Sequence, residues 1–132
     1  SIIKDIEEVA QDFAARYLFI GKKVEIPNAW ININEKKDLN SIHTHPGAIL
    51  SGVYYVRTPK DCGNLVFEHP AITAIERDWR FNKETKHTTM NSMVWSYPPK
   101  EGYLYMFPSW IPHLVEPSMS NKKRISISFN VW

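Results

Sequence analysis

From residue 24 to the C-terminus, the sequence is a series of short apolar or alternating runs separated by turn residues. The runs are VEI, AWININ, AILSGVYYVR, NLVFEH, SMVWSY, GYLYMFP, HLVE and KRISISFNVW. Such runs are typical of β-strands, because neighbouring side chains of a strand point to opposite faces. About seven or eight short strands predict a β-sandwich or barrel, and a jelly roll is the common form that encloses a small site.

The N-terminal segment follows a different period. Its apolar residues recur at intervals of three and four, as in an amphipathic helix. They are Ile2, Ile3, Ile6, Val9, Ala10, Phe13, Ala14 and Tyr17. We therefore expect a mainly β fold with one helix over residues 1–20 and a β-barrel over residues 24–132. A chain of 132 residues is about the size of a single domain with one core.

Residues 69–91 show neither period and are longer than most loops. Long loops on a rigid scaffold often contact substrates, so this insert is a candidate substrate-binding segment. Its aromatic and basic residues Arg77, Trp79 and Arg80 are the side chains that we expect at the substrate. A merely tolerated insertion explains the length equally well.

Charge and cysteine content limit the function classes. The formal net charge of +2 gives no case for a nucleic-acid or membrane surface. No run approaches the roughly 20 apolar residues of a membrane span, and the N-terminus lacks the layout of a signal peptide. The only cysteine, Cys62, excludes an internal disulfide and favours a reducing compartment. We expect a soluble cytoplasmic protein.

Three histidines are candidate metal ligands. His43 and His45 flank one threonine in HTHP, and at strand period two residues this far apart point to the same side. His113 follows the run GYLYMFPSWIP, and three histidines from two strands can fill one face of a metal ion while the opposite face stays open. A surface His-Thr-His and a hydrogen-bonded loop histidine are the competing interpretations.

Polar residues alternate with apolar ones along RISISFN. Arg124 and Ser126 share one face, and a guanidinium beside a hydroxyl is well suited to bind a carboxylate. Tyr55 in SGVYYVR can offer its hydroxyl to the same group, and Asn32 in AWININ adds a polar side chain that is unusual for a core. An edge strand with a solvated face, or a tyrosine buried in the core, fits the same pattern.

Taken in order, HTHP, SGVYYV, NLVFEHP, PKEGYLYMFPSWIPHLVEP and RISISFN resemble the Fe(II) and 2-oxoglutarate dependent oxygenase superfamily. Within it, the small microbial and phage-borne group related to prolyl hydroxylases is the most similar. The resemblance covers roughly residues 29–131. Its most specific parts are GYLYMFPSWIPH and the Arg124-x-Ser126 pair beyond His113.

The resemblance implies a double-stranded β-helix, a jelly roll whose open end holds Fe(II) on His43, His45 and His113. It also implies that Arg124 with Ser126 holds the distal carboxylate of 2-oxoglutarate, with Tyr55 nearby, and we add Asn32 to this set. No catalytic residue beyond the metal site is implied. The sequence departs from the superfamily at His45, where relatives usually have Asp or Glu.

The expected function is oxidative decarboxylation of 2-oxoglutarate to succinate, coupled through O2 to hydroxylation of a second substrate. That substrate is a small molecule or a protein side chain such as proline, and the enzyme acts in the cytoplasm of a microbe or an infected host cell. Two alternatives stay open: a three-histidine cupin-type dioxygenase or isomerase that needs no 2-oxoglutarate, and a jelly-roll binding module without catalysis.

Overall fold

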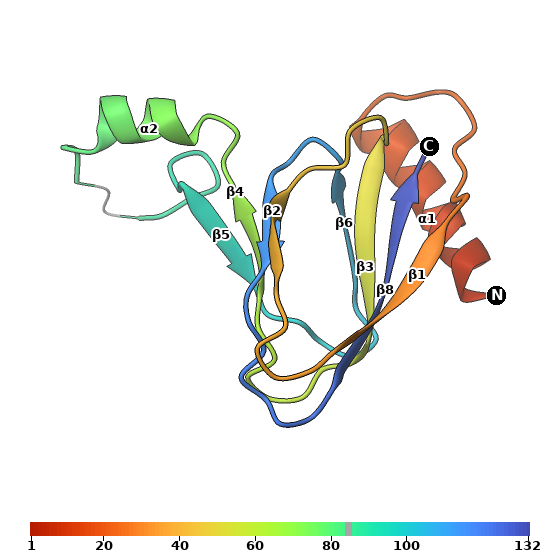
Figure 1. Cartoon of the computed structure of the whole chain (residues 1–132). Coiled ribbons are helices and arrows are strands. Elements are labelled where there is room, and N and C mark those ends of the chain that lie inside the picture. The colour runs from red at the N-terminus through yellow and green to blue at the C-terminus, as the bar shows by residue number, and fades with distance from the viewer. Residues whose placement is uncertain (84–85) are drawn as a thin grey trace.

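The computed structural model describes residues 1–83 and 86–132, in which two four-stranded antiparallel sheets face each other (Figure 1). The first sheet has, in order, the strands β1 (Ala29–Asn34), β8 (Arg124–Val131), β3 (Leu50–Arg57) and β6 (Leu104–Pro108). The second has β2 (Asn40–His43), β7 (His113–Val115), β4 (Leu65–Glu68) and β5 (Val94–Tyr97). The chain crosses repeatedly between the sheets, so the predicted jelly roll with an N-terminal helix is confirmed.

Two of the strand predictions need correction. The run VEI does not form a strand, although Glu25 exchanges two backbone hydrogen bonds with Trp132, at 3.0 and 2.9 Å. Strand β2 was not among the predicted runs. Its sequence NSIH contains a single aliphatic residue, Ile42, so it lacks the apolar alternation by which a strand is recognised in a sequence. All four residues are exposed. Each of the other predicted runs contains a strand.

Helix α1 (Ile2–Tyr17) covers the outer face of the first sheet and is shorter than the predicted span of 1–20. Its buried stripe, Ile6, Ala10 and Ala14, forms one core with Leu50, Phe129 and Val131 and other apolar residues. This core occupies only the outer face, so the inner face of the same sheet is available to line the space between the sheets. Neither helix in the described part of the chain is long and apolar enough to cross a membrane.

The insert over residues 69–91 was predicted to lack regular structure, and that prediction was wrong. It contains helix α2 (Ile72–Trp79), which lies at the β4–β5 end of the molecule, far from α1 (Figure 1). None of the α2 residues is fully buried, and its sequence ITAIERDW covers only about two turns. So short a segment gives a weak periodic signal. Residues 84 and 85 of the insert lie outside the described residues.

Candidate metal centre

His43 and His113 are neighbours because their strands pair. His43 is the last residue of β2 and lies opposite His113, the first residue of β7, in the antiparallel ladder. Residues that are directly opposite in such a ladder project to the same face of the sheet. Here both imidazoles project into the space between the sheets.

His45 also lies beside His113, but it is not part of a strand. It lies beyond the end of β2, so the strand-period argument that predicted its direction does not apply. The segment His45-Pro46-Gly47-Ala48 is instead a β-turn, with a hydrogen bond from Ala48 N–H to the His45 carbonyl at 3.3 Å. Gly47 has a φ of 91°, and a Cβ there would lie 2.9 Å from the Trp132 ring. The turn leads from His45 towards β3, and the His45 ring lies beside that of His113, with 5.1 Å between ring centroids.

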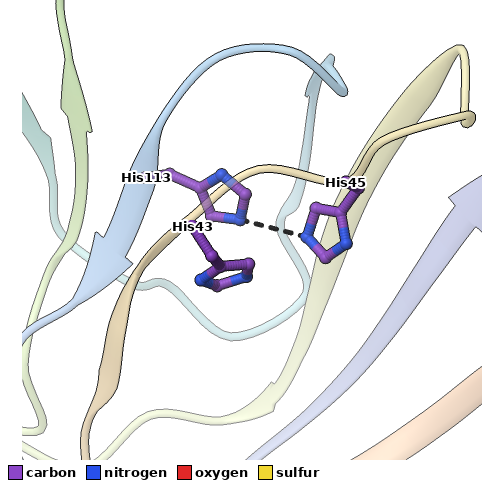
Figure 2. A group of neighbouring side chains, drawn as sticks. All are labelled: His43, His45 and His113. Carbon is purple, nitrogen blue, oxygen red and sulfur yellow. Dashed lines mark hydrogen bonds between the residues drawn. The ribbon is translucent and has the colours of Figure 1, made fainter.

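The three rings converge on one point (Figure 2). Their potential ligand atoms all lie within 4.8 Å of one another, and the Nε2 atoms of His45 and His113 are 3.2 Å apart. Two nitrogens at about 2.1 Å from one ion lie about 3.0 Å apart when they bind at right angles. The spacing therefore fits a shared metal ion.

Backbone carbonyls orient two of the imidazoles. His43 Nδ1–H donates to the carbonyl of Ser41 at 2.6 Å, and His113 Nδ1–H donates to the carbonyl of Ile111 at 3.0 Å. In this tautomer Nε2 of each ring keeps the free lone pair that can bind a metal, and such a bond from Nδ1 is the usual support for histidine ligands.

Burial keeps two of the histidines neutral. His113 is 5% exposed, and desolvation is the main cause that lowers its pKa to about 4, with a smaller contribution from the other two histidines. Desolvation and the neighbouring His43 also lower the pKa of His45. A metal ligand must be unprotonated, so both rings can bind a cation at neutral pH.

Three candidate cosubstrate residues form one row across the first sheet. Ser126 on β8 lies opposite Asn32 on β1 and opposite Tyr55 on β3. Ser126 and Tyr55 are 4% and 2% exposed, and Asn32 Nδ2 donates to Ser128 Oγ at 2.7 Å. Burial raises the pKa of Tyr55 to about 12, although Arg124 opposes this shift. The phenol is therefore a hydrogen-bond donor at neutral pH.

Arg124 begins β8, next to this row, and only 2% of it is exposed. Its guanidinium donates to the carbonyl of Cys62, and none of the ion pairs among the described residues involves it. A buried charge without a counter-ion is unfavourable, so this arginine suits an anionic ligand.

One cavity of about 470 Å³ contains all these groups. The predicted site residues that line it are His43, His45, His113, Arg124, Ser126, Tyr55 and Asn32. Its apolar walls include Leu65, Phe107 and Val115, and no Asp or Glu of the described residues lines it. Three imidazoles and an unpaired arginine in one space fit a divalent cation together with a dicarboxylate.

Sequence analysis missed several polar residues that line the cavity, and Ser51 is the most deeply buried of them. Ser51 is 2% exposed, lines the cavity and donates from Oγ to Asn130 Oδ1 at 2.8 Å. It lies on the inner face of β3 with Tyr55, so the strand period that singled out Tyr55 also carried the signal for Ser51.

The described residues of the insert lie apart from the cavity that holds the histidines, and none of them lines it. Trp79 and Arg80 instead line a separate cavity between α2 and β5, and Arg77 pairs with its neighbour Asp78 at 2.6 Å. That these side chains contact the second substrate stays a prediction.

Comparisons with known proteins agree with this geometry. A family model described as "Putative 2OG-Fe(II) oxygenase" matches residues 28–130. Curated proteins yield no match.

Several solved structures share the fold. They include a 2OG-Fe(II) oxygenase family oxidoreductase from Burkholderia pseudomallei, with 17% identity, a TM-score of 0.65 and coverage of 92% of this chain and 50% of that one. A Pseudomonas putida prolyl-4-hydroxylase has 16% identity, a TM-score of 0.66 and coverage of 98% and 63%. The epimerase SnoN from nogalamycin biosynthesis has 14% identity, a TM-score of 0.67 and coverage of 96% and 51%. The chain thus spans between 50% and 63% of the length of these proteins.

Proposed function

Because the chain belongs to the family of 2OG-Fe(II) oxygenases, we propose that it is a non-haem iron dioxygenase that couples the decarboxylation of 2-oxoglutarate to the hydroxylation of a second substrate. In this proposal, residues 1–132 act as one jelly-roll oxygenase domain. The observation that carries it is the cavity in which three imidazoles and the buried Arg124 share one space without an acidic residue among the described ones.

The histidines have the role of metal ligands in this proposal. His43, His45 and His113 bind Fe(II) through Nε2, while the carbonyls of Ser41 and Ile111 hold the first and last of these rings in place. His45 takes the place where relatives usually have a carboxylate. When bound, Fe(II) and 2-oxoglutarate would supply the oxidation chemistry together with O2, of which one oxygen atom enters succinate as CO2 is released and the other enters a C–H bond of the second substrate.

Arg124 and the neighbouring hydroxyls hold the cosubstrate. The guanidinium binds the distal carboxylate of 2-oxoglutarate, and the bond to the Cys62 carbonyl fixes its direction before the ligand arrives. Ser126 and the protonated Tyr55 each donate a further hydrogen bond, and Asn32 supports this row through Ser128. The apolar walls limit the access of water to the reacting groups.

Metal analysis of anaerobically purified protein, together with a succinate assay, tests the proposal. We expect one iron per chain and 2-oxoglutarate-dependent formation of succinate that a substrate stimulates. Iron without any binding of 2-oxoglutarate would favour the cupin-type dioxygenase or isomerase instead. Protein that binds neither would favour a binding module.

For the second substrate we propose a protein side chain such as proline. The likeness in fold to the Pseudomonas putida prolyl-4-hydroxylase supports this class, whereas SnoN comes from the biosynthesis of a small molecule. The test is succinate formation with proline-containing peptides, compared with the same peptides carrying alanine in place of proline. A prolyl substrate predicts stimulation by the first series and not by the second. Stimulation by neither series would contradict a prolyl substrate.

A further inference from the structure

Ser109 connects the loop that carries His45 with the turn that precedes His113. It follows β6 directly and is 5% exposed. Its carbonyl accepts a hydrogen bond from His45 N–H at 3.0 Å, and its own N–H donates to the Ile49 carbonyl at 3.1 Å. Its hydroxyl donates to the Ala48 carbonyl. These bonds tie both ends of the 45–49 loop to one residue.

The same short segment also orients His113. Ile111 N–H donates to the Pro108 carbonyl at 3.1 Å, which closes a turn around Ser109. The carbonyl of Ile111 then accepts the bond from His113 Nδ1–H at 3.0 Å. The turn over residues 108–111 is therefore a common support for His45 and His113, whose Nε2 atoms lie 3.2 Å apart.

Of the three histidines, His45 depends most on this support. His43 and His113 lie in paired strands, so the β2–β7 ladder fixes them. His45 lies in the connection between β2 and β3, outside both strands. The orientation of this loop decides whether its imidazole meets the other two.

We propose that Ser109 is a positioning residue of the metal centre, which clamps the 45–49 loop so that His45 stays within ligand distance of His113. The proposal rests on the metal centre described above and adds a residue that does not itself touch the metal. Losing a group that supports a metal ligand typically weakens metal binding about 10- to 100-fold. Ser109→Ala removes the hydroxyl and keeps the backbone bonds, so we expect the lower end, about tenfold.

Co(II) titration in competition with a chelator is the test, with the visible absorption of bound Co(II) as a report on the number of ligands. The variants are Ser109→Ala, His45→Ala and the double variant. Ser118→Ala is the matched control, because Ser118 is 0% exposed and does not line the cavity. Thermal unfolding of the chelator-treated proteins measures the structural effect of each loss separately.

If Ser109 acts through His45, Ser109→Ala weakens Co(II) binding and shifts its absorption towards that of His45→Ala, but it has no further effect when His45 is already absent. Ser118→Ala lowers thermal stability without changing Co(II) affinity. Wild-type affinity in Ser109→Ala, or an equal loss in the His45→Ala background, would overturn the proposal.

Two precautions keep the result decisive. If Ser109→Ala does not fold, Ser109→Cys replaces the hydroxyl with a slightly larger thiol that is a much weaker donor, and the same weaker Co(II) binding is expected, without the absorption of a Co(II)–thiolate bond. A wild-type protein that binds no Co(II) would overturn the metal centre and the role of Ser109 together. A wild-type protein that binds Co(II), together with a Ser109→Ala variant of unchanged Co(II) affinity, would overturn only the role of Ser109.

Discussion

The interior between the two sheets is polar on one side and aromatic on the other. One row of paired residues crosses it within the second sheet: His43, His113, Phe67 and Trp95, on β2, β7, β4 and β5. The polar half adds Arg124, Ser126 and Tyr55 from the first sheet. In the aromatic half, Phe67 packs at 4.8 Å from Phe107 and at 5.7 Å from Tyr97, measured between ring centroids.

The difference separates function from packing. Aromatic rings in tilted or edge contact stabilise a fold by burying apolar area. Buried polar groups need hydrogen bonds to offset their desolvation, and in the described residues no fully buried side-chain nitrogen or oxygen lacks one. Burying polar side chains stabilises a fold less than burying aromatic rings does, so the polar half is best explained by a ligand that it binds. The predictions below test this difference between the two halves.

Replacing His113 should have the largest effect on the polar half. His113 is the most buried of the three proposed ligands and lies beside both other histidines, so His113→Ala should abolish iron retention. Metal analysis after anaerobic purification measures it. His87→Ala is the control, because His87 is exposed and lies outside the cavity. Full iron content in the His113 variant, with the circular dichroism of the wild type, would refute the metal centre.

Arg124→Ala should abolish tight binding of the cosubstrate while iron binding persists. Removing one partner of a buried charged pair typically costs about 3 to 5 kcal/mol, which corresponds to at least roughly a 100-fold weaker affinity for 2-oxoglutarate. Calorimetric titration of the Mn(II) form measures it. Arg57→Ala removes an exposed arginine outside the cavity and should leave the affinity unchanged. Equal affinity in the wild type and the Arg124 variant would favour the cupin-type alternative.

Phe107→Ala tests the aromatic half. Phe107 is 7% exposed, and its ring lies 4.8 Å from Phe67 and 4.7 Å from His113. Deleting a buried phenylalanine ring costs about 3 kcal/mol or more, so urea denaturation should show a loss of this order in the free energy of unfolding. A stability within about 1 kcal/mol of the wild type would mean that the aromatic half does not hold the sheets together.

Acid should destabilise the metal-free protein through His113. Its pKa is about 4 in the folded protein against 6.5 when unperturbed, so the unfolded chain takes up the proton first. The stability is fully present above about pH 6.5 and decreases as the pH falls towards 4, by roughly 3 kcal/mol at most. Urea denaturation of chelator-treated protein at several pH values measures it. His113→Gln should flatten the curve between pH 6.5 and 5, and an unchanged slope would contradict the assignment.

Strand period was enough to predict most of the fold. The alternation in RISISFN correctly assigned Arg124 and Ser126 to one face of a strand, and apolar residues at intervals of three and four located the buried stripe of α1. Sequence reasoning failed for β2, whose residues are all exposed, and for α2, which is short and not fully buried at any position. Both elements depend on contacts with distant segments rather than on a local pattern.

The site, like the fold, was predictable where a local sequence pattern determines the direction of a side chain. Residues that share a strand face, such as Tyr55 and Ser51, follow from local periodicity. The direction of His45 does not, because a turn and the contact with Ser109 set it from outside the strand. Likewise, the bond from Arg124 to the carbonyl of Cys62 joins residues that no spacing rule connects.

His45→Asp should have the smallest effect on metal binding, and its direction is informative. The Nε2 atoms of His45 and His113 lie 3.2 Å apart, and the family resemblance implies a carboxylate at the position of His45. An aspartate is shorter but adds a negative charge to a cavity that has no Asp or Glu among its described lining residues. The added attraction for a cation should offset the shorter reach, so that Fe(II) affinity stays within about tenfold of the wild type or becomes tighter. Co(II) and Fe(II) titrations of the wild type, His45→Asp and His45→Ala measure these affinities. The alanine variant should bind each metal more weakly than the wild type and the aspartate variant. Loss of iron in the aspartate variant with the fold intact would show that His45 does not occupy the carboxylate position.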